Sequence, residues 1–157
     1  MKKQRGFSLI ELLIVVAIIL IIASMAIPNL LRARMSANEA SAVGAVRTLN
    51  AAEISYNSAY PTVGYAATLG ALSGTACAPP SAASACLIDT QLASGSKNGY
   101  TYALTASGEP VSTSEIVASP AVPNQTGVRY FCSFADAVVR YAESAITNCD
   151  GSITPLQ

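Results

Sequence analysis

Glu11 most needs a chemical explanation, because it is a carboxylate inside an otherwise nearly apolar stretch from Phe7 to Ile27. Insertion scales put the cost of a carboxylate deep in lipid at about 2.5 to 3.5 kcal/mol, and the stretch contains no basic residue to pair with it. Cleavage of the chain after Gly6 would create a partner, because Phe7 would then carry a free α-amino group, which is largely cationic at neutral pH. The expected chemistry is an ion pair between Glu11 and such an amine.

A helix is the element that must position this carboxylate. The apolar stretch has 21 residues, close to the ~20 that a helix needs to cross ~30 Å of hydrocarbon. The preceding residues 1–6 include three basic side chains, and such a leader keeps its end of the helix on the cytoplasmic side. The alternative is an ordinary signal peptide, since Ser24-Met25-Ala26 is similar to a small-x-small cleavage site. Against this alternative, the apolar region of a signal peptide is usually only about 7 to 15 residues long.

The segment Lys2-Lys3-Gln4-Arg5-Gly6-Phe7-Ser8-Leu9-Ile10-Glu11-Leu12 resembles the class III leader of type IV pilins and type II secretion pseudopilins. The resemblance covers residues 1 to 35. It implies cleavage between Gly6 and Phe7 by a prepilin peptidase, N-methylation of Phe7, and polymerisation in which Glu11 neutralises the amine of a neighbouring copy. It also implies that the prepilin lies in the inner membrane and that the mature chain ends in an extracellular pilus filament.

The function implied by this resemblance is structural, that of a type IV pilus subunit supporting adhesion, twitching motility or DNA uptake. The implied partners are other copies of the chain, the prepilin peptidase, the pilus assembly machinery and the inner membrane. Two alternatives stay open, a type II secretion pseudopilin and a secreted binding protein. No nucleic-acid partner is indicated, because without residues 1–6 the chain has six basic and nine acidic residues, a net charge of −3.

The helix is expected to continue over residues 29–60 as an amphipathic segment packed on a globular domain, because apolar residues recur there at steps of three and four. Pro28 ends the hydrophobic segment 7–28 and should act as a helix hinge, through a kink or local break; two abutting helices are the alternative. The residues expected on the packed face are Leu30, Leu31, Val43, Val46, Leu49, Ile54 and Tyr56.

The remainder of the chain predicts a connecting loop over residues 61–98 and an antiparallel sheet with a C-terminal tail over residues 99–157. Four β-prone runs in this last region are separated by turn residues. The expected fold is therefore α+β, a long N-terminal helix on a small antiparallel sheet of three to four strands, and the resemblance implies the pilin fold. The runs are Tyr100–Thr105, Ser114–Ser119, Gly127–Phe134 and Ala137–Ala142.

Four cysteines lie beyond the export segment, and in an oxidising compartment an even number indicates two disulfides. Three pairings are possible. We favour Cys77 with Cys86 and Cys132 with Cys149, because each pair closes a short loop. A zinc site is disfavoured, since the chain has no histidine and no Cys-x-x-Cys pair.

Catalytic chemistry is poorly supported, because a chain without histidine has no histidine base and no Ser-His-Asp arrangement. We expect no enzymatic activity, no cofactor and no metal site. Asp136, Glu143 and Asp150 are conceivable calcium ligands, but they do not have the spacing of an EF-hand. The favoured interpretation is that they are solvated surface acids.

Overall fold

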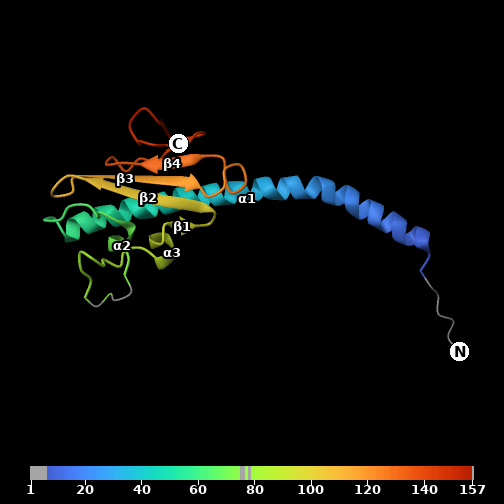
Figure 1. The fold of residues 1–157 in the computed structure, drawn as a ribbon, viewed down its shortest axis with the longest axis horizontal. Coiled ribbons are helices and arrows are strands. Elements are labelled where there is room, and N and C mark those ends of the chain that lie inside the picture. The colour runs from blue at the N-terminus through green and yellow to red at the C-terminus, as the bar shows by residue number, and fades with distance from the viewer. Residues whose placement is uncertain (1–6, 75–76, 78, 157) are drawn as a thin grey trace. The chain divides into compact units, whose positions relative to one another are not determined.

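A computed structural model describes residues 7–74, 77 and 79–156 of the chain (Figure 1). The chain divides after Arg34 into two compact units. One helix, α1 (Leu9–Ala59), supplies the regular structure described in the first unit and the first element of the second. All the strands lie in the second unit, together with two helices of four residues each, α2 (Leu69–Leu72) and α3 (Thr90–Ala93).

In the first unit α1 continues without interruption through Pro28. The expected local break at Pro28, and the alternative of two abutting helices, are therefore wrong. The physical reason is that a proline inside a helix removes one backbone hydrogen bond and crowds one carbonyl, and a helix can absorb both by bending.

In the second unit α1 buries one face, and this face differs from the expected one. Val46, Leu49 and Tyr56 are buried as predicted, but Ile54 is 55% exposed. We predicted the packed face from the positions of the large apolar residues. In the structure, alanines and two glutamates make up much of the buried face. The buried residues of α1 are Glu39, Ala42, Ala45, Val46, Leu49, Ala52, Glu53 and Tyr56.

The sheet of the second unit is antiparallel throughout and has six strands in chain order, two more than the upper limit of the prediction. The four predicted runs correspond to the four longest strands, and the two additional strands are two residues each. A strand of two residues is too short to show the alternation from which strands are recognised. The strands are β1 (Ser96–Lys97), β2 (Tyr100–Ser107), β3 (Thr113–Pro120), β4 (Tyr130–Ser133), β5 (Arg140–Ala142) and β6 (Thr154–Pro155).

The two faces of the sheet have different roles. Alternate residues of β2 and β3 are buried, and in Figure 1 both strands run beside the part of α1 that belongs to this unit. This inner face joins the helix in one hydrophobic core, in which Tyr56 and Leu49 meet Tyr100, Ile116 and Phe131. The opposite, outer face carries mostly polar side chains and is partly covered by the C-terminal tail.

Candidate functional site

The N-terminal end of α1 carries two of the predicted site residues, Phe7 and Glu11, while Gly6 lies outside the described residues. The Phe7 side chain is 86% exposed just ahead of the helix. The backbone N–H of Ser8 donates a hydrogen bond to Oε2 of Glu11 at 3.0 Å. The structure thus places the Glu11 carboxylate over the first turn of α1.

Ser8 and Glu11 have the spacing of a capping box, in which a glutamate at the third helical position binds the backbone N–H of the N-cap residue. Because α1 begins at Leu9, Ser8 occupies the N-cap. Our sequence analysis missed this role, although the Ser-x-x-Glu signal is visible in the sequence. Within one chain, then, Glu11 caps its own helix through one carboxylate oxygen and leaves Oε1 without a hydrogen bond among the described residues.

The part of α1 that follows is exposed around its whole circumference. From Leu9 to Ile27, every large apolar side chain is between 47% and 77% exposed. An 18-residue window of the helix has a mean hydropathy of 3.0, and none of it is buried. By length and composition this helix is able to cross a membrane.

Two buried carboxylates connect α1 to the rest of the second unit, and neither was predicted. Glu39 accepts hydrogen bonds from the backbone N–H groups of Val128 at 2.9 Å and Arg129 at 3.2 Å, and its Oε2 lies 2.8 Å from the Arg129 guanidinium. Burial opposes ionisation of Glu39, but these hydrogen bonds and the nearby charge outweigh it and lower the pKa of the carboxyl. Glu53 receives one hydrogen bond, from the backbone N–H of Ala66 at 2.9 Å.

The cysteines form two disulfides, Cys77 with Cys86 and Cys132 with Cys149. This is the pairing that the short loops favoured. In β4, Cys132 lies directly opposite Val117 of β3, so both side chains point to the outer face of the sheet. The second disulfide therefore fastens the C-terminal tail across that face.

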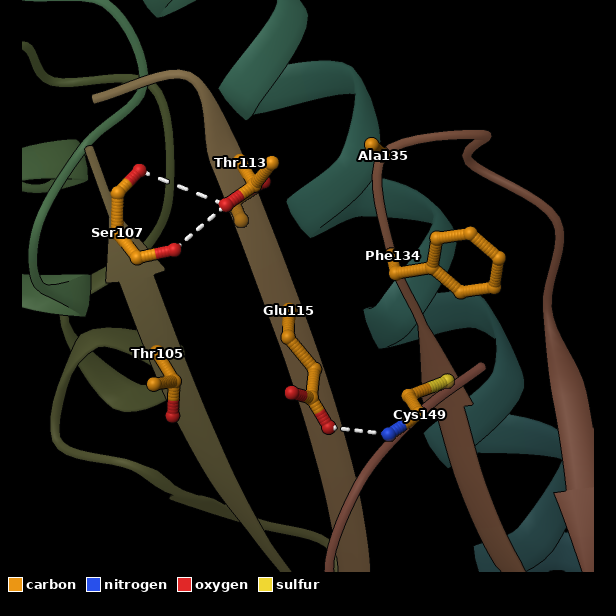
Figure 2. A pocket seen from close by; sticks show the side chains of 8 residues that line it. Thr105, Ser107, Thr113, Glu115, Phe134, Ala135 and Cys149 are labelled. Carbon is orange, nitrogen blue, oxygen red and sulfur yellow. Dashed lines mark hydrogen bonds between the residues drawn. The ribbon is translucent and has the colours of Figure 1, made fainter. Parts of the chain in front are cut away.

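A cleft of about 230 Å³ opens beside the fastened tail, on the outer face of the sheet (Figure 2). Glu115 lies opposite Thr105 of the neighbouring strand, and its Oε1 accepts a hydrogen bond from the backbone N–H of Cys149 at 2.6 Å. Farther along the same two strands, the hydroxyls of Ser107 and Thr113 are 2.7 Å apart. The lining residues are Thr105, Ser107, Thr113, Ser114, Glu115, Phe134, Ala135 and Cys149.

Two of the three carboxylates considered for calcium have other contacts in the structure. Asp136 forms an ion pair with Arg140 at 2.6 Å, Asp150 accepts hydrogen bonds from Ser152, and Glu143 is exposed. Within the described residues no three His, Cys, Asp or Glu side chains come together as metal ligands.

A family model described as the prokaryotic N-terminal methylation motif matches residues 1–27. The chain is 62% identical over 39 residues to the type IV wide pilus major component PilA4 of Thermus thermophilus. It is 43% identical over 65 residues to the type II secretion system core protein G of Vibrio cholerae, and 35% identical over 82 residues to the protein of that name from Dickeya chrysanthemi. Residues 1–27 thus match the methylation motif, and part of the chain is similar to a type IV pilin and to type II secretion core proteins. The predicted resemblance is thereby confirmed.

The relatives share only part of the chain's length. The alignments cover 25%, 40% and 50% of the chain, and 30%, 44% and 52% of PilA4 and the two G proteins respectively. The chain thus aligns with about half or less of each of these relatives. No solved structure matches it. The roles of the buried carboxylates and of the cleft therefore follow from their contacts in this structure alone.

Proposed function

We propose that this chain is a structural subunit of a type IV pilus and not an enzyme. In this proposal a prepilin peptidase removes residues 1–6, Phe7 is N-methylated, and the mature chain leaves the inner membrane to polymerise into an extracellular filament. The observation that carries the proposal is the methylation motif followed by a helix whose only acid in the apolar stretch is Glu11.

The capping geometry supports a role for Glu11 between copies. Its Oε2 is occupied by the N–H of Ser8, and the other oxygen is able to accept a hydrogen bond from the α-amino group at Phe7 of a neighbouring copy. Such an ion pair removes the cost of two separate charges among apolar helices. The exposed apolar side chains then pack against those of other copies, as they pack against lipid before assembly.

The proposed assembly also gives a role to each of the other helical segments. Residues 7–28 serve first as the membrane anchor and then as the filament core, and residues 29–60 connect this core to the sheet. Pro28 is proposed as the hinge at which α1 adjusts during assembly, because a missing backbone hydrogen bond makes bending easier there. The adhesive, motile or DNA-uptake role belongs to the assembled pilus.

A pseudopilin of a type II secretion system is the second candidate. The similarity to the G proteins extends over 65 and 82 residues, against 39 for PilA4, and this observation favours it. Deletion of the gene distinguishes the two: loss of long surface filaments supports the pilus, and loss of exoprotein secretion with surface filaments intact supports the pseudopilin.

The test of the proposed mechanism compares two substitutions of Glu11. Glutamine satisfies the capping box as glutamate does, so Glu11→Gln keeps the hydrogen bond from Ser8 and removes only the charge, whereas Glu11→Ala removes both. We expect both variants to be inserted and cleaved, and both to yield few filaments. Abundant filaments from Glu11→Gln would show that Glu11 serves as a helix cap and not as an ionic partner.

N-terminal sequencing of the mature protein provides the second test. Methylated Phe7 as first residue is expected. A mature chain beginning at Ile27 would instead establish an ordinary signal peptide and a secreted protein.

A further inference from the structure

The cleft on the outer face of the sheet presents hydrogen-bond acceptors around a single charge. Glu115 is its only charged lining residue. One carboxylate oxygen of Glu115 binds the N–H of Cys149, and the other has no hydrogen-bond partner among the described residues. The hydroxyls of Thr105, Ser107 and Thr113 lie along the same strands (Figure 2). A carboxylate with neighbouring hydroxyl oxygens suits a cation with several N–H donors.

Half of the basic residues in 7–157 are already paired. Residues 7–157 contain six basic residues, and three of them form ion pairs: Lys97 with Asp89, Arg129 with Glu39, and Arg140 with Asp136. No ion pair among the described residues involves the other three, which are Arg32, Arg34 and Arg47, all on α1 and all exposed.

Arg47 is the only one of these three in the same unit as the cleft. It lies about 100° around the helix from the buried Val46 and points to the exposed side, where Gly44 is also found. A Cβ placed on Gly44 would have no atom within 4 Å. The side of α1 that carries Arg47 is therefore open to a partner.

Arg47 and Glu115 lie on opposite sides of the second unit. Arg47 faces away from the sheet, and the cleft faces away from the helix; in Figure 2 the helix passes behind the strands that carry the lining side chains. The core of the unit separates them, so they cannot meet within one chain. Two different surfaces on opposite sides of a molecule produce head-to-tail association, which can repeat without closing.

We propose that the cleft around Glu115 binds the guanidinium of Arg47 from a second copy of the chain. This inference rests on the proposed function, because it describes a contact between neighbouring subunits of the filament. Arginine suits the cleft since its planar fork of five donors can bind one carboxylate and nearby hydroxyl oxygens together. The only lysine in residues 7–157 is Lys97, which is bound to Asp89.

The experiment is a double-mutant cycle on filaments assembled from the full chain with its machinery. The variants are Arg47→Gln, Glu115→Gln and the two combined; glutamine at position 115 keeps an acceptor for the N–H of Cys149. We expect each single change to lower the yield of sheared filaments several-fold and to lower the salt concentration at which they dissociate. The double variant should be no worse than either single one, because both changes break the same contact.

Three further variants make the outcome specific. Glu109→Gln changes an exposed acid that does not line the cleft and should leave yield and salt resistance unchanged. Thr105→Val alters the cleft without touching the hydrogen bond between Glu115 and Cys149, and its effect should vanish in the Arg47→Gln background. The charge swap Arg47→Glu with Glu115→Arg should recover filaments relative to Arg47→Glu alone.

Filaments from Glu115→Gln as abundant and as salt-resistant as the native ones would overturn the inference. Effects of Arg47→Gln and Glu115→Gln that simply multiply in the double variant would overturn it too. In either case the proposed function stands if native filaments form and Glu11→Gln filaments do not. A mature chain beginning at Ile27 would remove the proposed function itself.

Discussion

Glu53 Oε2 accepts a hydrogen bond from the backbone N–H of Ala66 at 2.9 Å, while Glu53 Oε1 is buried without a partner among the described residues. The residue is 2% exposed, and a cavity of about 20 Å³ lies beside it. Burial raises the pKa of Glu53 to about 7, against the smaller lowering effect of the hydrogen bond from Ala66. The neutral carboxyl is therefore the form that suits this position.

The stability of the second unit should decrease as pH rises towards and through neutrality. Between about 4.5, the ordinary pKa of a glutamate, and about 7, the folded state holds a proton on Glu53 that the unfolded chain has lost. The free energy of unfolding then falls with rising pH, by up to about 3 kcal/mol for such a shift. Urea unfolding of the full chain in detergent, followed by tyrosine fluorescence at pH 5 and pH 8, measures it. Glu53→Gln should be nearly insensitive to pH over this range, and an equal pH dependence in both proteins would contradict the assignment.

Replacement of Glu39 by alanine should destabilise the second unit by about 1 to 3 kcal/mol, because it leaves the N–H of Val128 and the partly exposed Arg129 guanidinium without their acceptor. Glu39→Gln should cost less, since one acceptor oxygen remains. The lowered pKa of Glu39 also predicts that its contribution is lost only in acid, as the pH falls through that pKa. Urea midpoints provide the measurement, with the exposed Glu143→Ala as a control expected to stay within about 0.5 kcal/mol of the native protein.

Removal of the disulfide between Cys132 and Cys149 by paired serine substitutions should cost about 3 kcal/mol in the chain-entropy model for a loop of this length. It should also weaken the hydrogen bond between Glu115 and the N–H of Cys149, because the tail is no longer fastened. The unfolding midpoint of the variant measures the loss. Peptide mapping without reduction checks the pairing independently, and a peptide joining Cys77 to Cys132 would show that it is wrong.

Two glycine-to-alanine changes should have opposite signs. Gly44 lies inside α1 with open space around its missing Cβ, so Gly44→Ala should stabilise the helix by about 1 kcal/mol. A Cβ on Gly127 would overlap the hydroxyl and ring of Tyr100, whose hydroxyl donates a hydrogen bond to the carbonyl of Arg129 at 2.8 Å. Gly127→Ala should therefore cost about 1 to 3 kcal/mol. Thermal unfolding of both variants in detergent compares them directly; an equal effect would show that the Tyr100 contact is unimportant.

The parts of this fold that were predictable have a strong periodic or compositional signal. The apolar stretch from Phe7 to Ile27 is long enough to predict its helix, and β-prone runs bounded by turn residues predicted six of the eight residues in each of β2 and β3. The spacing between Ser8 and Glu11 also indicates a capping box. We missed this role, because we interpreted Glu11 only as the ionic partner of another chain.

Other features depend on tertiary contacts that one sequence does not reveal. In the sequence Glu39 and Glu53 look like surface acids of an amphipathic helix. Their burial could not be predicted, because their carboxylates accept hydrogen bonds from backbone N–H groups that lie 89 and 13 residues away in the chain. Ile54 looks like a core residue, yet it lies about 100° around the helix from Glu53. One wall of the cleft comes from Cys149 in the C-terminal tail, which the bond to Cys132 fastens to the outer face of the sheet.

The uniform exposure of the helix from Leu9 to Ile27 has a consequence for the life of the molecule. A solitary copy released into water would expose this apolar surface and tend to aggregate, so the proposed filament could not grow from dissolved subunits. In the proposed pilus, new subunits would therefore be stored in the bilayer, and a shrinking fibre would return them there. The number of copies held in lipid would then limit how far a fibre can extend at any moment.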